Sequence, residues 1–242
     1  MSTAATETKK NSSTATFSCL VLDYDLEIPM DIANLDDFRK WAQSEQFPES
    51  GRIDFLGNRI EVDMSPEDLF CHGTAKMEIS TVLYLHVQQE KLGFVFTDRA
   101  RISSPAANLS VEPDIIFLSH ESRRSDRTRL VPKASGQEGR YVEIEGAVDL
   151  VVEIISDSSV TKDTKRLPAA YYQAGVCEFW LVDARSDDLQ FQIHHRGESQ
   201  FEPARPDEDG FQFSQVFQRR YRLERHVQPP DNLWQYDLQE AE

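Results

Sequence analysis

In the first part of the chain, the spacing of hydrophobic positions changes from that of a helix to that of a strand. Residues 36–47 place Phe38 and Trp41 at helical spacing and predict a short amphipathic helix. Residues 52–63 alternate apolar and polar positions instead, and Gly57 and Asn58 divide them. Because both residues tolerate the positive φ of a tight turn, this segment predicts a β-hairpin.

A long helix is expected after the hairpin. Ser65 is a suitable N-cap, and Pro66 suits the first helical position. Apolar residues then recur at helical spacing to about Lys91, and Gly93 follows as a stop signal.

The remaining pattern predicts strands, with one more helix at about 163–174 that ends at Gly175. We expect strands over residues 94–103, 111–119, 147–156, 177–184, 188–195 and 211–223. This order predicts an α/β fold in which helices flank a mixed sheet, with an N-terminal hairpin and extra strands near the C-terminus.

Composition adds expectations about the number of domains, the two ends of the chain and the cellular compartment. A chain of 242 residues with 39% hydrophobic residues suits one domain with appended segments. Residues 1–16 predict a disordered tail and residues 227–242 an acidic arm, which leaves 17–226 for the domain. No apolar run approaches the roughly 18 residues of a membrane span. Three separated cysteines without a Cys-x-x-Cys pair indicate reduced thiols in a cytoplasmic protein.

The net charge of -16 argues against an extended nucleic-acid surface, since binding to phosphates depends on Lys and Arg. A basic footprint would have to be local. Two segments qualify, one at residues 123–133 and one at residues 219–225. Each could contact phosphate, form a solvated face or contact the acidic surface of the chain itself.

Two carboxylates stand in otherwise apolar strands and carry the candidate chemistry. Glu153 lies within LVVEII and Asp114 within EPDIIFL. A carboxylate in a strand that is covered on both faces is unfavourable unless something pairs with it. Sheet pairing could bring the two together, and a hard cation such as Mg²⁺ would offset their repulsion. The alternative is that both lie at strand ends and reach water.

The chain resembles the Uma-two family of bacterial endonucleases, which belongs to the PD-(D/E)XK, restriction-endonuclease-like group. The resemblance covers about residues 50–195 and rests on motifs in a fixed order: Pro113-Asp114, Glu153 with Ser156, Asp163, Tyr171, Ala174-Gly175-Val176 and Phe179-Trp180-Leu181-Val182-Asp183. It implies a restriction-endonuclease-like domain over residues 17–226. It also implies a Mg²⁺- or Mn²⁺-dependent endonuclease that cuts DNA to leave a 5′-phosphate and a 3′-hydroxyl.

One position departs from the pattern of the group. The lysine of Glu-x-Lys would fall at Ile155, and the family's usual alternative position is Leu167. The remaining candidates are Lys162 and Lys165. On a regular helix Lys165 would lie about 160° from position 167, whereas Lys162 could swing from the preceding loop to the strand end, which slightly favours Lys162. Alternatively, both are surface lysines and the site is inactive.

The resemblance implies further site residues. Asp114, Glu153 and the backbone carbonyl of Ile154 would bind the metal, with Lys162 or Lys165 orienting the attacking water or neutralising the transition state. His72 on the long helix and Glu61 in the hairpin resemble family positions; otherwise His72 is a core residue and Glu61 a solvent-facing one.

For partners, we expect DNA, contacted through Arg123, Arg124, Arg127 and Arg129. By analogy with restriction-like enzymes, we also expect a homodimer, and no membrane. Two rival interpretations stay open. In the first, the fold has lost catalysis and acts as a nucleic-acid or protein binding module. In the second, the protein is a metal-dependent hydrolase of a non-nucleic phosphodiester.

Overall fold

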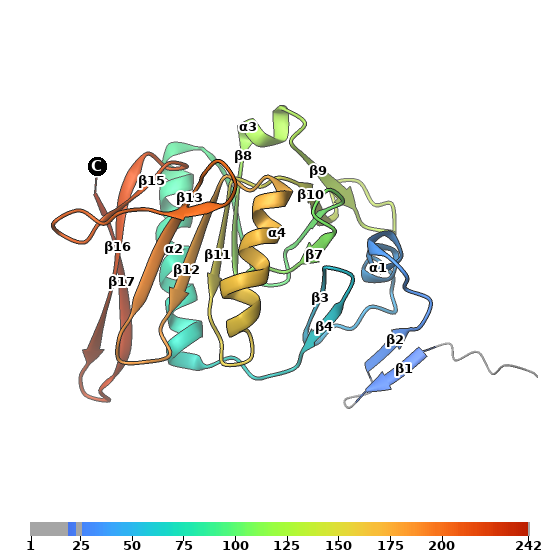
Figure 1. The fold of residues 1–242 in the computed structure, drawn as a ribbon, viewed down its shortest axis with the longest axis horizontal. Helices are drawn as coiled ribbons and strands as arrows, with labels where there is room; N and C mark the ends of the chain where they lie inside the picture. The colour runs from blue at the N-terminus through green and yellow to red at the C-terminus, as the bar shows by residue number, and fades with distance from the viewer. Residues whose placement is uncertain (1–18, 23–25, 242) are drawn as a thin grey trace, which may run out of the picture.

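A six-stranded mixed sheet lies at the centre of the computed structural model, which describes residues 19–22 and 26–241 (Figure 1). Its strand order is β14-β13-β12-β11-β8-β5. The strands are β5 (Gly93–Thr97), β8 (Ile115–Ser119), β11 (Leu150–Ile154), β12 (Glu178–Asp183), β13 (Gln190–Arg196) and β14 (Phe201–Pro203). β11 and β12 pair in parallel, and β8 pairs with β11 antiparallel.

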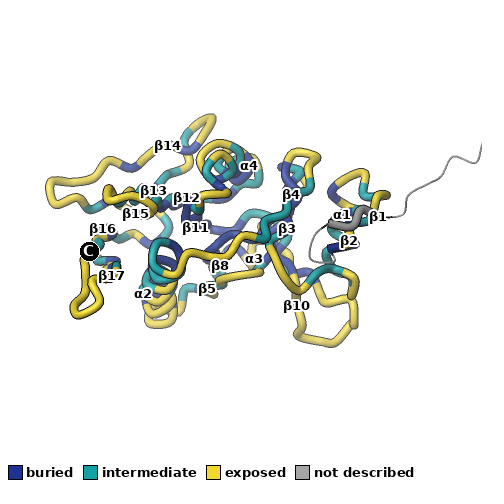
Figure 2. Tube along the Cα trace, turned by 90° about the horizontal axis from the view of Figure 1, so that it is seen from below, coloured by how far each residue is buried: buried dark blue, intermediate teal, exposed yellow. Residues whose placement is uncertain are grey.

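Two helices cover opposite faces of this sheet. α2 (Thr74–Glu90) packs on one face in a core cluster with Val152, and α4 (Leu167–Ala174) packs on the other in a cluster with Val151. Neighbouring residues of a strand point to opposite faces, so β11 must be apolar at successive positions. Figure 2 shows the resulting concentration of buried positions where β11 and β12 lie between α4 and α2.

A second six-stranded sheet, with the order β4-β3-β7-β6-β10-β9, lies beside the first. Its strands are β3 (Arg52–Leu56), β4 (Ile60–Asp63), β6 (Arg101–Ser104), β7 (Leu109–Val111), β9 (Thr128–Pro132) and β10 (Tyr141–Gly146). The β3–β4 pair confirms the predicted hairpin. The hairpin β1 (Cys19–Leu22)–β2 (Leu26–Pro29) and helix α1 (Leu35–Ala42) complete this side, where Phe38 and Trp41 pack against Ile53.

Two predicted strands are each divided between the two sheets. The segment 94–103 forms β5 and β6, separated by Asp98 and Arg99, which both have positive φ. The segment 111–119 contains the end of β7 and the whole of β8. Pro113 lies between them and has no N–H to continue a ladder. Asp114 therefore falls where the chain crosses from one sheet to the other.

The predicted start of the long helix is wrong. Asp68, not Ser65, caps it, because its side chain accepts hydrogen bonds from the N–H groups of Phe70 and Cys71 at 2.9 and 2.6 Å. A π-helix, η2 (Leu69–Gly73), then precedes α2. The helix ends at Lys91, which adopts the left-handed conformation.

Gly93 has a different role from the expected stop signal. It begins β5, where a Cβ atom would lie 2.1 Å from the carbonyl oxygen of Leu118. The residue is required by this close approach of two backbones.

The C-terminal residues form a sheet, whereas their composition predicts an acidic arm from residue 227. β15 (Gln212–Ser214), β16 (Arg219–Gln228) and β17 (Leu233–Ala241) pair antiparallel. Tyr236 and Leu238 of β17 are buried and join the core cluster around α2. These two apolar residues recur with the period of a strand, although acidic residues around them dominate the composition.

A short helix, α3 (His120–Arg124), follows β8 at the end of that strand remote from Asp114. The expected tail at residues 1–16 lies outside the described residues. Within the described part of the chain, Cys71 and Cys177 are free thiols, and no helix has the length and apolar character needed to cross a bilayer.

Candidate active site

The register of the central sheet brings the two predicted carboxylates together. Ile115 of β8 lies opposite Val152 of β11, and continuing this antiparallel register by one residue places Asp114 opposite Glu153. Directly opposed residues project their side chains on the same face. Asp114 is 0% and Glu153 1% exposed. The backbone N–H of Ile154 also donates to Asp114 Oδ2 at 2.8 Å.

Positive and hydrogen-bonding groups surround Asp114. Arg52 of β3 places Nη2 at 2.5 Å from Asp114 Oδ1, and His72 of η2 places Nε2 at 3.3 Å from Oδ2. Burial alone would raise the pKa of Asp114, but the charge of Arg52 and the contact with His72 outweigh it and hold this pKa far below its ordinary value. Asp114 is therefore ionised at neutral pH.

Glu153 has the opposite environment. The Tyr171 hydroxyl of α4 donates to its Oε1, while its Oε2 has no hydrogen-bond partner. Burial, together with repulsion from Asp114 and Asp163, raises the pKa of Glu153 well above its ordinary value. An unpartnered buried carboxylate oxygen beside an ionised carboxylate is a position at which a cation would lower the energy of the folded state.

The donor chemistry of this pair fits a hard divalent cation, for which carboxylate and carbonyl oxygens are the usual ligands. Glu153 Oε2 is unengaged, but Arg52 occupies one side of Asp114. Among residues 26–241, no group of three or more His, Cys, Asp or Glu side chains is placed to hold a metal. A cation here would thus depend on the two carboxylates and a backbone carbonyl, and it would have to share Asp114 with Arg52 or displace it.

Of the two candidate lysines, only Lys162 joins the cluster. Its Nζ forms an ion pair with Oδ2 of Asp54, a fully buried residue of β3 whose Oδ1 accepts the backbone N–H of Glu112 at 3.0 Å. Burial would lower the pKa of Lys162, but the Asp54 charge and hydrogen bond outweigh burial, so its pKa is raised. Lys165 is exposed, and Leu167 is a core residue at 1% exposure.

Both helices that contribute to the site begin with a π-turn. Lys162 opens η3 (Lys162–Arg166), where the N–H of Leu167 bonds to the carbonyl of Lys162, five residues earlier. His72 lies in η2, where the N–H of Thr74 likewise bonds to the carbonyl of Leu69. π-turns inside helices are rare and are frequent at functional sites. Here they precede the regular helices that pack on the two faces of the sheet.

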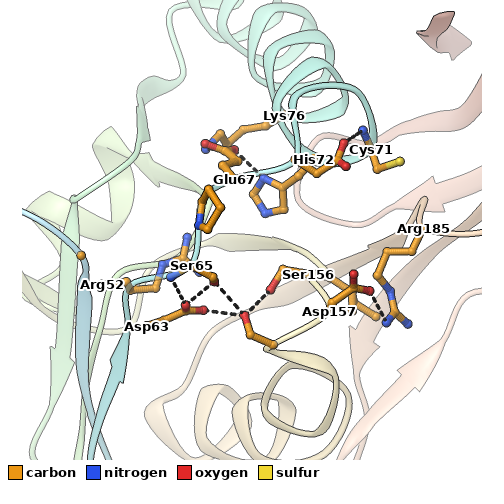
Figure 3. A pocket seen from close by; sticks show the side chains of 15 residues that line it. Arg52, Asp63, Ser65, Glu67, Cys71, His72, Lys76, Ser156, Asp157 and Arg185 are labelled. Carbon is orange, nitrogen blue, oxygen red and sulfur yellow. Dashed lines mark hydrogen bonds and ion pairs between the residues drawn. The ribbon is translucent and has the colours of Figure 1, made fainter. Parts of the chain in front are cut away.

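A cleft of about 480 Å³ opens beside the residues that contact Asp114 (Figure 3). Arg52 and His72 line it, whereas Asp114 and Glu153 lie behind them. Three hydroxyls form one wall, and Asp63 accepts hydrogen bonds from two of them. These hydroxyls belong to Ser65, Ser156 and Ser158, which are connected at 3.1–3.2 Å.

The remaining predicted site residues lie elsewhere or have other partners. Glu61 of β4 pairs with Arg166, with one contact at 3.0 Å, and so links the hairpin to η3. Arg127 contacts Ser122 and Asp149, and Arg129 pairs with Glu145 at 2.8 Å. Arg123 and Arg124 lie on α3.

Both basic segments thus lie away from the cleft or have partners within the chain. In the segment 219–225, Arg219 pairs with Glu240 at 2.9 Å, and Arg225 stacks on Trp234, with 4.0 Å from its Cζ to the ring centre. The arginines of α3 lie at the far end of β8 from Asp114 (Figure 1).

Four residues of the site were not predicted as site residues from the sequence: Arg52, Asp54 and Tyr171, which contact the carboxylates or Lys162, and Asp163, whose charge acts on Glu153. In RIDFL, Arg52 and Asp54 occupy the polar positions of an alternating strand, which is the pattern of a solvent-facing edge. Tyr171 and Asp163 were visible only as parts of the family pattern. Asp163 is 1% exposed, its Oδ1 lacks a partner, and burial raises its pKa to about 6.

The fold and the carboxylate pair define a restriction-endonuclease-like α/β protein. The model of the family Uma2, described as "Putative restriction endonuclease", matches residues 35–227, and the chain belongs to this family. The match confirms the resemblance seen in the sequence. Family membership supports a nuclease, which is a hydrolase that acts on nucleic acid.

One similar solved structure is described as "a putative nuclease belonging to DUF820" from Anabaena variabilis ATCC 29413. It superposes with a TM-score of 0.54 and 18% sequence identity, over 76% of this chain and 90% of that chain. At this identity the likeness concerns the fold alone. None of the curated proteins compared with the chain matches it.

Proposed function

We propose that the cleft above Asp114 and Glu153 is the active site of a divalent-metal-dependent endonuclease that hydrolyses DNA phosphodiester bonds. The observation that carries this proposal is the pair of opposed carboxylates, fully buried, with one oxygen of Glu153 unpartnered. Such an arrangement is unfavourable for folding unless it serves a cation or a proton. The family to which the chain belongs supports the nuclease part of the proposal.

Asp114, Glu153 and the backbone carbonyl of Ile154 would hold Mg²⁺ or Mn²⁺. When bound, such a cation lowers the pKa of a water molecule and stabilises negative charge on the scissile phosphate.

The side chains of the protein perform the remaining tasks. Tyr171 fixes the orientation of the Glu153 carboxylate through its hydroxyl. Arg52 lies at the boundary between the cleft and Asp114, where its planar guanidinium can donate two hydrogen bonds to a phosphate. Lys162, kept protonated by Asp54, supplies a proton or a positive charge beside the carboxylates.

Single-stranded DNA, plasmid DNA and short duplex DNA, each incubated with Mg²⁺ or Mn²⁺, test this function. We expect Asp114→Asn to lower the cleavage rate by about 10³-fold, because several kcal/mol of transition-state charge stabilisation is lost. Glu121→Gln, an exposed substitution on α3, is the matched control and should cleave as the wild type does. Equal cleavage by wild type and Asp114→Asn, with both folded, would remove the assignment.

A second function is favoured by the partners of Asp114. Arg52 and His72 already engage both of its oxygens, and Ile155 and Leu167 fill the usual lysine positions as core residues. These features suit a nuclease fold that has lost catalysis and binds nucleic acid or protein. Titration with Mn²⁺, followed by calorimetry, separates the two. A binding module should take up Mn²⁺ equally in wild type and Glu153→Gln, whereas the metal enzyme should lose binding in the variant.

A further inference from the structure

The depth of the site restricts what can reach it. Asp114 and Glu153 are almost without exposed surface, and Arg52 and His72 separate them from the cleft. The cleft volume of about 480 Å³ is within the range of pockets that take small ligands. A reacting phosphate must therefore enter the cleft. If it belongs to a larger DNA molecule, its nucleotide must project away from the rest of that molecule.

The charges that line the cleft oppose a long polyanion. Four carboxylates line it, those of Asp63, Glu67, Asp68 and Asp157. The cations that line it are already paired: Arg52 with Asp114 at 2.5 Å, Lys76 with Glu67 at 2.6 Å, and Arg185 with Asp183 at 2.8 Å. Duplex binding depends on unpaired Lys and Arg that release counterions from many phosphates. The described lining of this cleft offers no such row.

The exposed arginines of α3 do not supply such a row either. The exposed arginines of α3, Arg123 and Arg124, lie at the opposite end of β8 from Asp114. β8 spans five residues, or roughly 17 Å at the rise of a strand. A duplex held on α3 would therefore not bring its backbone into the cleft without a sharp bend.

We infer that the site acts on an unpaired DNA strand or strand end, whose single backbone enters the cleft, and not on a continuous duplex. The inference rests on the proposed nuclease function. A duplex is stiff over about 150 base pairs and presents one charge every ~1.7 Å to the acidic cleft. A single strand bends freely and can insert one phosphodiester. The hydroxyls of Ser65 and Ser158, which donate to Asp63, can rotate to donate instead to its phosphate or sugar oxygens.

Three DNA substrates of one sequence, with Mn²⁺ present, test the inference: a single strand, a blunt duplex, and a duplex with a single-stranded overhang. We expect kcat/KM for the single strand to exceed that for the blunt duplex at least about tenfold, equivalent to 1.4 kcal/mol. The overhang should be cut only in its unpaired part. Equal or faster cleavage of the blunt duplex would overturn the substrate class and leave the nuclease function intact.

Bis(4-nitrophenyl) phosphate separates this outcome from failure of the proposed function itself. It is a small diester that needs no strand binding, so an active site should hydrolyse it whatever its polymer preference. If the wild type hydrolyses neither this diester nor any DNA, the nuclease function fails and the substrate inference with it.

A charge substitution in the cleft lining tests whether the acidic lining is what excludes the duplex. The side chain of Asp157 is 96% exposed and contacts Arg185 at 3.4 Å, so Asp157→Asn removes a negative charge without disturbing the core. We expect it to reduce the preference for single strand over duplex by about threefold, the scale of one exposed charge interaction. Glu121→Gln on α3 should leave the preference unchanged. An unchanged preference in Asp157→Asn would show that the acidic lining does not exclude the duplex.

Discussion

Each end of β11 has a buried carboxylate, and the two carboxylates differ in their hydrogen-bond partners and neighbouring charges. At the beginning, Asp149 is satisfied: its Oδ2 accepts the N–H of Ser119 and its Oδ1 the hydroxyl of Ser122, both at 2.7 Å. Arg127 adds an ion pair at 3.5 Å. At the other end, Glu153 has one donor and one unpartnered oxygen, and its nearest charges include two other carboxylates.

This difference distinguishes a structural acid from a functional one. Burial by itself does not, because both side chains are inaccessible or nearly so. A satisfied carboxylate links α3 to the sheet and leaves nothing for a ligand to gain. An unsatisfied one among like charges binds a cation or a proton favourably, and such groups cluster at catalytic sites.

Isosteric substitution at each end of β11 should separate the two roles most strongly. We expect Glu153→Gln to lower the DNA cleavage rate by about 10³-fold while changing the free energy of unfolding by no more than about 1 kcal/mol. Asp149→Asn should retain cleavage but lose about 2 kcal/mol of stability, since the amide nitrogen that replaces one carboxylate oxygen cannot accept the hydrogen bond made to that oxygen. Cleavage assays and urea unfolding measure both. The reverse pattern would contradict the comparison.

The two lysines offer the next contrast. Lys162→Met should lower the cleavage rate by about 10²-fold, because a positioned proton donor or charge is removed. Lys165→Met, a change of an exposed residue in the same π-turn, should have no effect. Lys162→Arg keeps the ion pair with Asp54 and serves as a check on folding. Equal rates in Lys162→Met and Lys165→Met would exclude Lys162 from the reaction.

Removing Arg52 should leave the buried carboxylate of Asp114 without its ion-pair partner. We expect Arg52→Gln to destabilise the metal-free protein by about 3 kcal/mol, because Asp114 loses its ion-pair partner in a buried setting. Mn²⁺ should then raise the thermal midpoint more in the variant than in the wild type, since the cation takes the place of the guanidinium. Scanning calorimetry with and without Mn²⁺ checks this. An equal shift in both proteins would mean that Arg52 and the cation do not compete.

The last expected effect is a pH dependence of stability from Asp163, which is confined to mildly acidic pH. Burial raises its pKa from 3.8 to about 6, so the folded state binds the proton more tightly than the unfolded state. Stability from this group is therefore present at low pH and lost as pH rises from about 4 to about 6. Relative to Asp163→Asn, the wild type should lose roughly 3 kcal/mol across this window and nothing above it. Urea unfolding at several pH values measures the difference, and parallel curves for the two proteins would contradict it.

The parts of the fold and site that depend on local pattern could be predicted from the sequence. Asp114 and Glu153 were recognisable because an acid within an apolar strand violates the pattern around it. The hairpin at 52–63 and the succession of strands along the chain follow from alternation and turn residues. The resemblance to the family likewise rests on short motifs of neighbouring residues.

The missed features depend on contacts between distant segments. Arg52 meets Asp114 across 62 residues, and Lys162 meets Asp54 across 108. In sequence, both hairpin residues are indistinguishable from solvent-facing ones. The strand β17 was hidden for a related reason, because its acidic composition outweighs the two buried positions that hold it on α2.

The π-turn at residues 162–166 has a consequence for how this site could change during evolution. Lys162 precedes Tyr171 by nine residues, and the turn between them is wider than a regular helical turn. Insertion or loss of a single codon there would rotate the lysine by about 100° around the helix axis, because each helical residue contributes that angle. The residues of α4 that pack on the sheet would keep their positions. A single-codon change in this turn would therefore alter the position of the lysine without altering the core.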